Sequence, residues 1–251
     1  MRTDDDHDAP TPPGIGLSAR FARFAIGAVG RVVYRPIVEG RDNVPLTGRV
    51  ILAANHLSFI DSPVLTLLAP RPVQFLAKAD YFTGTGPRGA LSRSFFTAVG
   101  AVPVERGAGH AAQEALDLGR AILERDEAFA VYPEGTRSRD GRLYRGRTGV
   151  AWLALTTGAP VVPVGLIGTQ ELQPVGSVIP RLHRITVRFG DALDLSRHGS
   201  ADSGRARRHA TDEVMTAIHA LSEQEAAGVY NESPPTTTAE RIRRALPHER
   251  R

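Results

Sequence analysis

The stretch AANHLSFIDSP, residues 53–63, directly follows the apolar run RVIL. A short apolar run that ends in Asn-His is typical of a buried strand that delivers polar side chains to the edge of a sheet. His56 and Asp61 are five residues apart, so on one regular helix they would lie about 140° apart around the axis. We therefore expect a strand followed by a loop, in which the carboxylate can return to the imidazole.

Asp61, Ser62 and Pro63 are typical of a helix start, because Asp is a common N-cap and proline is tolerated in the first turn. A carboxylate that accepts from one ring N–H fixes the tautomer of a histidine and leaves the other nitrogen as a base. The alternative interpretation is that Asp61 only caps the helix and His56 is an ordinary loop residue. The spacing by itself favours this alternative.

Apolar runs of strand length alternate with segments of helical character along most of the chain. The strand-like runs are PIVEG, RVILAA, VQFLAK, AVPVE, AFAVYP, VVPVGLIG and ITVRFG, and the helical segments are 62–69, 88–98, 111–125, 148–157 and 205–227. This alternation predicts an α/β fold with a layered, mostly parallel sheet and flanking helices.

An amphipathic helix is expected before this sheet. Leu17, Phe21 and Phe24 recur at helical spacing, with Arg20 and Arg23 elsewhere on the helix surface.

The chain is divided by composition into four parts. Residues 1–16 are rich in Pro, Gly and Asp and are expected to be disordered, and 17–35 form the amphipathic helix. We assign 36–228 to the α/β domain and 229–251 to a flexible basic tail.

The 251 residues include no cysteine, which excludes disulfides, thiolate metal sites and an acyl-cysteine intermediate. No apolar run of about eighteen residues is present and the acidic N-terminus has no signal core, so we expect an intracellular protein. The formal net charge is +4. Almost all of the positive charge is arginine, since Lys78 is the only lysine. Such a surface suits nucleic acid, anionic lipid or phosphorylated ligands.

A second polar block, VYPEGTRSRDGRLYRGRTG, occupies residues 131–149 after an apolar run. Glycine allows close backbone approach, and hydroxyl, amide and guanidinium groups donate to phosphate oxygens. GAVPVER, residues 100–106, ends another strand-like run with a Glu-Arg pair.

Four blocks in this order resemble the glycerolipid acyltransferases that include 1-acylglycerol-3-phosphate acyltransferase. The first, Asn-His-x-x-x-x-Asp, is here Asn55, His56 and Asp61; the third, Phe/Tyr-Pro-Glu-Gly-Thr-Arg-Ser, spans 132–138. The second and fourth are 100–106 and 162–164, and the likeness covers about 38–192. Two residues depart from the family pattern, and they bear on which acceptor is bound more than on the reaction. Glu105 precedes Arg106 where Asp is common, and Arg147 stands where the family often has Lys.

The resemblance implies transfer of a fatty acyl group from acyl-coenzyme A or acyl carrier protein to the free hydroxyl of 1-acylglycerol-3-phosphate. His56 would be the general base and Asp61 its orienting partner. The predicted substrate-binding residues are Asn55, Ser58, Lys78, Arg106, Glu134, Gly135, Thr136 and Arg137. Asn55 and Ser58 also fit a role in holding the loop, and Glu134 a role in shaping its own loop. No metal and no cofactor beyond the thioester co-substrate is expected.

Because acceptor and product are lipids, we expect helix 17–35 to dock on a membrane without crossing it. The protein is thus expected at the cytoplasmic face of the cell membrane, as a peripheral protein. Partners are then the lysophospholipid, the thioester donor and the membrane surface, and not nucleic acid.

Three alternatives remain open. GTGPRG, residues 84–89, matches a dinucleotide-binding pattern, but ADYFT separates it from the preceding strand and Pro87 interrupts it. The arginines are typical of a nucleic-acid-binding protein, but that function does not explain the His-Asp block. The same chemistry also fits glycerol-3-phosphate or another lyso-lipid as acceptor.

Overall fold

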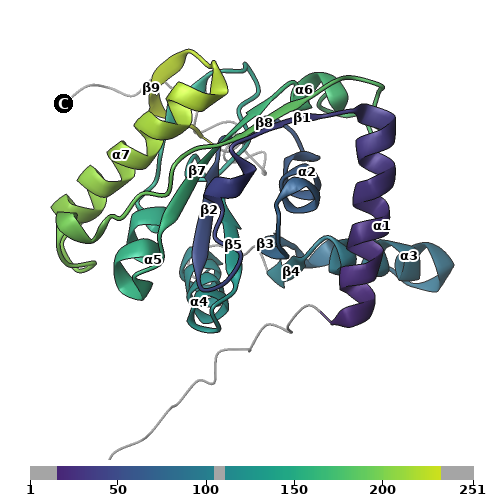
Figure 1. Ribbon diagram of the computed structural model, residues 1–251, viewed down its shortest axis with the longest axis horizontal. Helices are drawn as coiled ribbons and strands as arrows, with labels where there is room; N and C mark the ends of the chain where they lie inside the picture. The colour runs from purple at the N-terminus through teal and green to yellow at the C-terminus, as the bar shows by residue number, and fades with distance from the viewer. Residues whose placement is uncertain (1–15, 105–110, 233–251) are drawn as a thin grey trace, which may run out of the picture.

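The computed structural model describes residues 16–104 and 111–232, and within them a seven-stranded sheet forms the centre of the molecule (Figure 1). Its strands are β1 (Ile37–Glu39), β2 (Val50–Ala54), β3 (Val73–Lys78), β4 (Ala101–Val104), β5 (Ala128–Val131), β7 (Val161–Ile167) and β8 (Thr186–Phe189). The order is β1-β8-β7-β2-β5-β3-β4, and the strands from β7 to β4 run parallel. β8 is antiparallel to β7 and parallel to β1.

Helices cover both faces of this sheet (Figure 1). One face carries α1 (Leu17–Tyr34), α2 (Asp61–Leu68), α3 (Gly86–Ala98) and the short α6 (Thr169–Leu172), and the other carries α4 (Ala111–Glu124), α5 (Gly149–Thr157) and α7 (Gly204–Ser222). Short 3-10 turns are η1 (Arg41–Asn43), η2 (Ala79–Tyr81) and η3 (Ser196–His198).

β2 lies inside the sheet, and all of its residues are fully buried. Leu52 packs in the apolar cluster on the α2 side and Ile51 in the cluster on the α5 side. A parallel strand that is covered on both faces needs apolar residues at every position, which explains why VILAA does not alternate with polar residues. The predicted α/β fold with a mostly parallel sheet and flanking helices is confirmed.

Arg23 and Arg31 of α1 point toward the protein. The Arg23 guanidinium donates to the carbonyls of Thr66, Ala69 and Arg71 at 2.7–3.0 Å, and Arg31 donates to the Leu67 carbonyl at 3.1 Å. These carbonyls lie at and just beyond the C-terminal end of α2, where helical partners run out. Arg23 is thus half-buried on the side of α1 that faces α2.

Several large apolar side chains of α1 lie on its outer surface. Leu17, Phe21 and Phe24 are all strongly exposed. Among the helices that the structure describes, none is long and apolar enough to span a bilayer.

The C-terminal region differs from the prediction. The helix expected over 205–227 ends at Ser222, because Glu223 takes a left-handed conformation with φ 58°. The chain then forms β9 (Ala226–Tyr230), which pairs in parallel with β6 (Leu143–Arg145) in a separate small sheet. The predicted domain boundary at residue 228 is therefore wrong, since β9 crosses it. Most of the segments predicted to be disordered or flexible, 1–16 and 229–251, lie outside the described residues.

Candidate active site

The loop after β2 curls back on itself, so that the Asp61 carboxylate meets the chain that precedes it. Its Oδ2 atom accepts from the amides of Leu57 and Ser58 at 2.6 and 2.8 Å and lies 2.8 Å from His56 Nδ1. Ile60 is the N-cap of α2 and Asp61 is the first residue of the helix. The predicted N-cap role of Asp61 is thus wrong, whereas the predicted pairing with His56 is present.

The imidazole of His56 is held in one orientation. Its ring stacks on Tyr132, with centroids 4.0 Å apart and planes 16° from parallel. Since Asp61 Oδ2 already accepts two amide protons, it faces Nδ1 as an acceptor, so the neutral form of the ring carries its proton on Nδ1 and has Nε2 as the free nitrogen. The ring also lines a cleft at this end of the sheet.

The segment 132–138 holds the backbone of the same histidine by hydrogen bonds. Fully buried Glu134 accepts from the backbone amides of His56 at 2.9 Å and Tyr144 at 3.0 Å, and the Ser138 amide donates to the His56 carbonyl at 2.7 Å. Burial raises the pKa of Glu134 from 4.5 to about 7, against the opposing effect of the two amide donors. Glu134 therefore ties the two polar segments together.

Asn55 and Ser58 fix the same loop on its other side. The Asn55 amide donates to the Leu166 carbonyl at 2.9 Å and to Gln224 Oε1 at 2.8 Å, while the Leu166 amide donates to Asn55 Oδ1 at 2.7 Å. Ser58 Oγ donates to the Gln173 carbonyl at 2.6 Å.

Burial separates loop-holding residues from residues that a ligand can reach. Asn55, Ser58 and Glu134 are buried and engaged with the protein, so their predicted direct contact with substrate does not fit the structure. Their geometry suits the other role considered for them, which is holding the loops.

A cleft of about 600 Å³ opens at the carboxyl ends of β2, β3 and β5. The predicted site residues that line it are His56, Lys78, Gly135, Thr136 and Arg137. Aromatic and aliphatic side chains form the rest of the lining, among them Phe59, Phe75, Tyr81, Phe96 and Phe129. The cleft thus combines one imidazole, two cationic side chains and an extended apolar wall. Arg106 lies outside the described residues.

Two residues that the sequence analysis did not single out also belong to the site. Tyr132 supports the His56 ring, and its hydroxyl lies 2.9 Å from Ser62 Oγ. Gln224 is 169 positions from Asn55, and its amide also donates to the Gly141 carbonyl at 2.7 Å. Tyr132 belongs to the motif at 132–138, which could have indicated it, whereas no local pattern marks Gln224.

Within the described residues, no group of three or more His, Asp or Glu side chains is arranged to hold a metal ion.

Comparison with known proteins finds similar acyltransferases. The acyltransferase family model matches residues 35–167, which include both polar loops. The chain is 32% identical over 146 residues to the chloroplastic 1-acyl-sn-glycerol-3-phosphate acyltransferase BAT2 of Brassica napus, a match that covers 57% of this chain and 40% of the relative. It is 27% identical over 135 residues to the 1-acyl-sn-glycerol-3-phosphate acyltransferase of Borreliella burgdorferi, covering 54% and 52%.

A solved structure is similar over more of the chain. The crystal structure of the 1-acyl-sn-glycerophosphate acyltransferase PlsC from Thermotoga maritima matches with a TM-score of 0.60 and 25% identity, over 80% of this chain and 78% of that chain. The match to the two sequence relatives is shorter, since the chain spans only 40% and 52% of their lengths.

Proposed function

Because the chain belongs to the acyltransferase family, we propose that it moves a fatty acyl group from a thioester to the free hydroxyl of 1-acylglycerol-3-phosphate, giving phosphatidic acid. The observation that carries this proposal is the Asp61–His56 pair, whose imidazole faces a cleft with cationic and apolar walls. The names of the relatives and of the similar solved structure support the choice of acceptor.

His56 acts as the general base in this proposal. As the acceptor oxygen attacks the acyl carbonyl carbon, its proton passes to Nε2, because an alcohol is too weak an acid to ionise beforehand. Asp61 holds the tautomer and stabilises the imidazolium that forms. The carbon–sulfur bond then breaks and the thiolate leaves, taking up the proton. Direct transfer fits a chain without cysteine.

The phosphate of the acceptor binds at the cationic part of the cleft. Arg137 and Lys78 are exposed there, and a guanidinium offers a planar fork for phosphate oxygens. Arg106 is assigned to the same phosphate by its place in the second motif. The donor is acyl-coenzyme A or acyl-acyl carrier protein, with no metal and no further cofactor.

The enzyme works as a peripheral protein at the cytoplasmic face of the cell membrane, where its lipid acceptor resides. The exposed apolar side chains of α1 support this part of the proposal, since water does not stabilise such a surface.

Product analysis tests the function. Purified protein is incubated with each acceptor (1-acylglycerol-3-phosphate, glycerol-3-phosphate and a neutral lyso-lipid) and with each donor, and mass spectrometry identifies the products. We expect phosphatidic acid from 1-acylglycerol-3-phosphate, and no product with a His56→Ala variant. Acylation of glycerol-3-phosphate alone would replace the proposed acceptor, and absence of any acyl ester would refute the activity.

A further inference from the structure

The segment between α6 and β8 exposes an unusual amount of apolar surface. Val178, Ile179 and Leu182 are 88%, 77% and 80% exposed, and Val175 is exposed beside them. Single exposed apolar residues are normal on soluble proteins, but a cluster of this kind marks a surface that meets another apolar phase.

The segment is held in this conformation. The buried Gln173 side chain donates to the carbonyls of Ser177 and Val178 at 3.2 Å, and the Arg181 amide donates to the Leu172 carbonyl at 2.7 Å. These bonds fix both ends of the turn, so the apolar side chains do not fold back onto the core. Their exposure is built into the fold.

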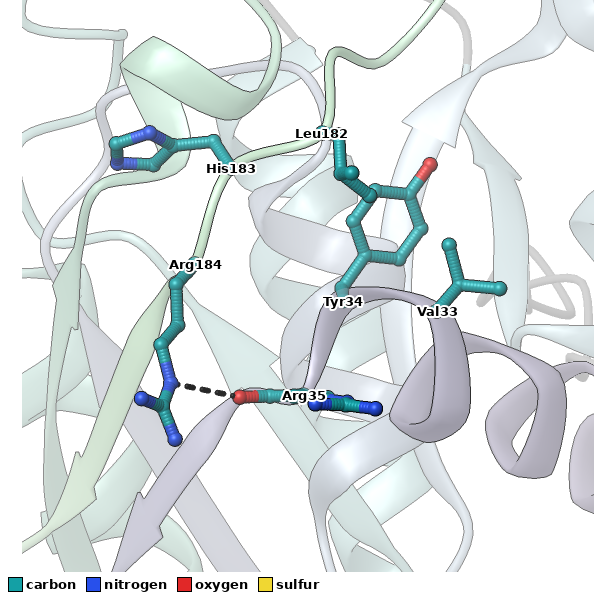
Figure 2. Close-up of a pocket in the computed structure, with 6 residues that line it drawn as sticks. All are labelled: Val33, Tyr34, Arg35, Leu182, His183 and Arg184. Atoms are coloured by element: carbon teal, nitrogen blue, oxygen red, sulfur yellow. Dashed lines mark hydrogen bonds between the residues drawn. The ribbon is translucent and has the colours of Figure 1, made fainter.

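The segment lies beside the C-terminal end of α1. Figure 2 shows Leu182, His183 and Arg184 next to Val33, Tyr34 and Arg35, where Arg184 Nε donates to the Arg35 carbonyl at 3.0 Å. Val32 and Val33 of α1 are also exposed. The apolar surface of the helix therefore continues onto residues 174–184.

The two segments that form this surface, 16–38 and 173–185, carry no acidic side chain, and the exposed Glu39 and Glu171 lie just outside them. Arg35, Arg181 and Arg184 are exposed there. Apolar side chains surrounded by cations complement an anionic bilayer, in which the former enter the acyl region and the latter meet the headgroups.

We propose that residues 174–184 form a second membrane-docking element, which acts with α1 and binds anionic lipid. The proposal rests on the proposed function, and it names the surface through which the enzyme reaches its lipid substrate. Ser58 Oγ donates to the carbonyl of Gln173 at the base of this segment. Docking therefore places the catalytic loop directly behind the membrane contact.

The experiment compares vesicle binding by the full chain and its variants. Co-sedimentation with vesicles of phosphatidylglycerol and phosphatidylcholine is measured at low and high salt. The triple variant Val178→Ser, Ile179→Ser, Leu182→Ser should bind more weakly by a factor of at least about ten at both salt concentrations, because apolar burial is lost. Arg181→Gln should weaken binding about fivefold at low salt only.

A matched control removes exposed apolar residues from other surfaces, in the variant Leu46→Ser, Val229→Ser, and should bind like wild type. Circular dichroism verifies that each variant is folded. Wild-type binding by the triple variant would overturn the proposal. So would loss of a dimer in sedimentation velocity with vesicle binding unchanged, because the surface would then join two copies of the chain.

Acylation of a dispersed short-chain lysophosphatidic acid is measured in parallel. A triple variant that acylates this substrate but fails to bind vesicles supports docking. If wild type acylates no acceptor, the proposed function fails, while vesicle binding by the variants still decides the docking proposal.

Discussion

Two regions of the molecule depart from the usual distribution of side chains, in which polar groups are exposed and large apolar groups are buried. They are the loops around His56 and the surface formed by α1 and residues 174–184. The first region buries polar groups such as Asn55, Asp61 and Glu134, and the second exposes large apolar groups such as Phe21 and Ile179. A buried polar group destabilises a protein unless it is hydrogen-bonded, whereas an exposed apolar cluster favours association with another apolar surface.

The difference between them lies in where the partners are found. Asn55 and Glu134 have partners within the chain, at 2.7–3.0 Å. The apolar surface has no such cover among the described residues, which is why its partner is sought outside the chain. We expect the first region to position a reactive group, and in our proposal the second attaches the molecule to a membrane.

Removing the base tests the first region most directly. His56→Ala should lower the acylation rate by about 10²- to 10⁴-fold with the fold intact, since no other group takes the proton. Asp61→Asn should also lower the rate strongly, because a neutral amide no longer stabilises the imidazolium that forms during attack. His209→Ala, an exposed histidine of α7, is the control. Near-native turnover by either variant would show that the buried pair only supports the loop.

The pH dependence of the free energy of unfolding tests whether burial raises the pKa of Glu134. Its folded pKa of about 7 lies above the ordinary value of 4.5, so the folded chain keeps this proton at pH values where the unfolded chain has lost it. Its contribution to stability is therefore full below about pH 4.5 and is lost as the pH rises through 7, by at most about 3 kcal/mol.

Urea unfolding of wild type and Glu134→Gln at several pH values between 4.5 and 8 measures this contribution, because the variant has no group to titrate there. The stability of wild type relative to the variant should fall with pH. A constant difference would mean that the two amide donors keep the carboxylate ionised throughout.

A pair of variants within α1 separates its inner and outer faces. Arg23→Met should lower the free energy of unfolding by about 2–3 kcal/mol, because carbonyls at the end of α2 lose a charged donor. Phe21→Ser, Phe24→Ser should leave the unfolding midpoint unchanged and weaken vesicle binding. If the second variant unfolds more easily and binds normally, the outer face of α1 is covered by protein.

Arg137 stands at the rim of the cleft, between the buried loops and solvent. Arg137→Ala should raise the KM for 1-acylglycerol-3-phosphate about tenfold and leave the KM for the thioester nearly unchanged, because only the acceptor loses a charge-assisted contact. Arg139→Ala is the matched control on the same loop. A larger rise for the thioester would assign Arg137 to the donor instead.

The sequence by itself determined the strands of the main sheet and most of its helices, because these depend on local hydrophobic patterns. It also marked His56 and Asp61, through the resemblance of the polar blocks to a known family, because their spacing by itself favoured an ordinary loop residue and a helix cap. The same local evidence failed at β9, where AAGVY continues a helical pattern and becomes a strand only by pairing with β6.

Only the tertiary structure decided how distant segments meet. The strand order puts β5 beside β2. This brings Glu134 into hydrogen-bonding distance of the His56 amide and the Tyr132 ring against the imidazole. The inward direction of Arg23 depended on where α2 ends, and the bond of Gln224 to Asn55 depended on where α7 ends. Such contacts depend on the topology of the whole chain, and for this reason no local pattern of residues predicts them.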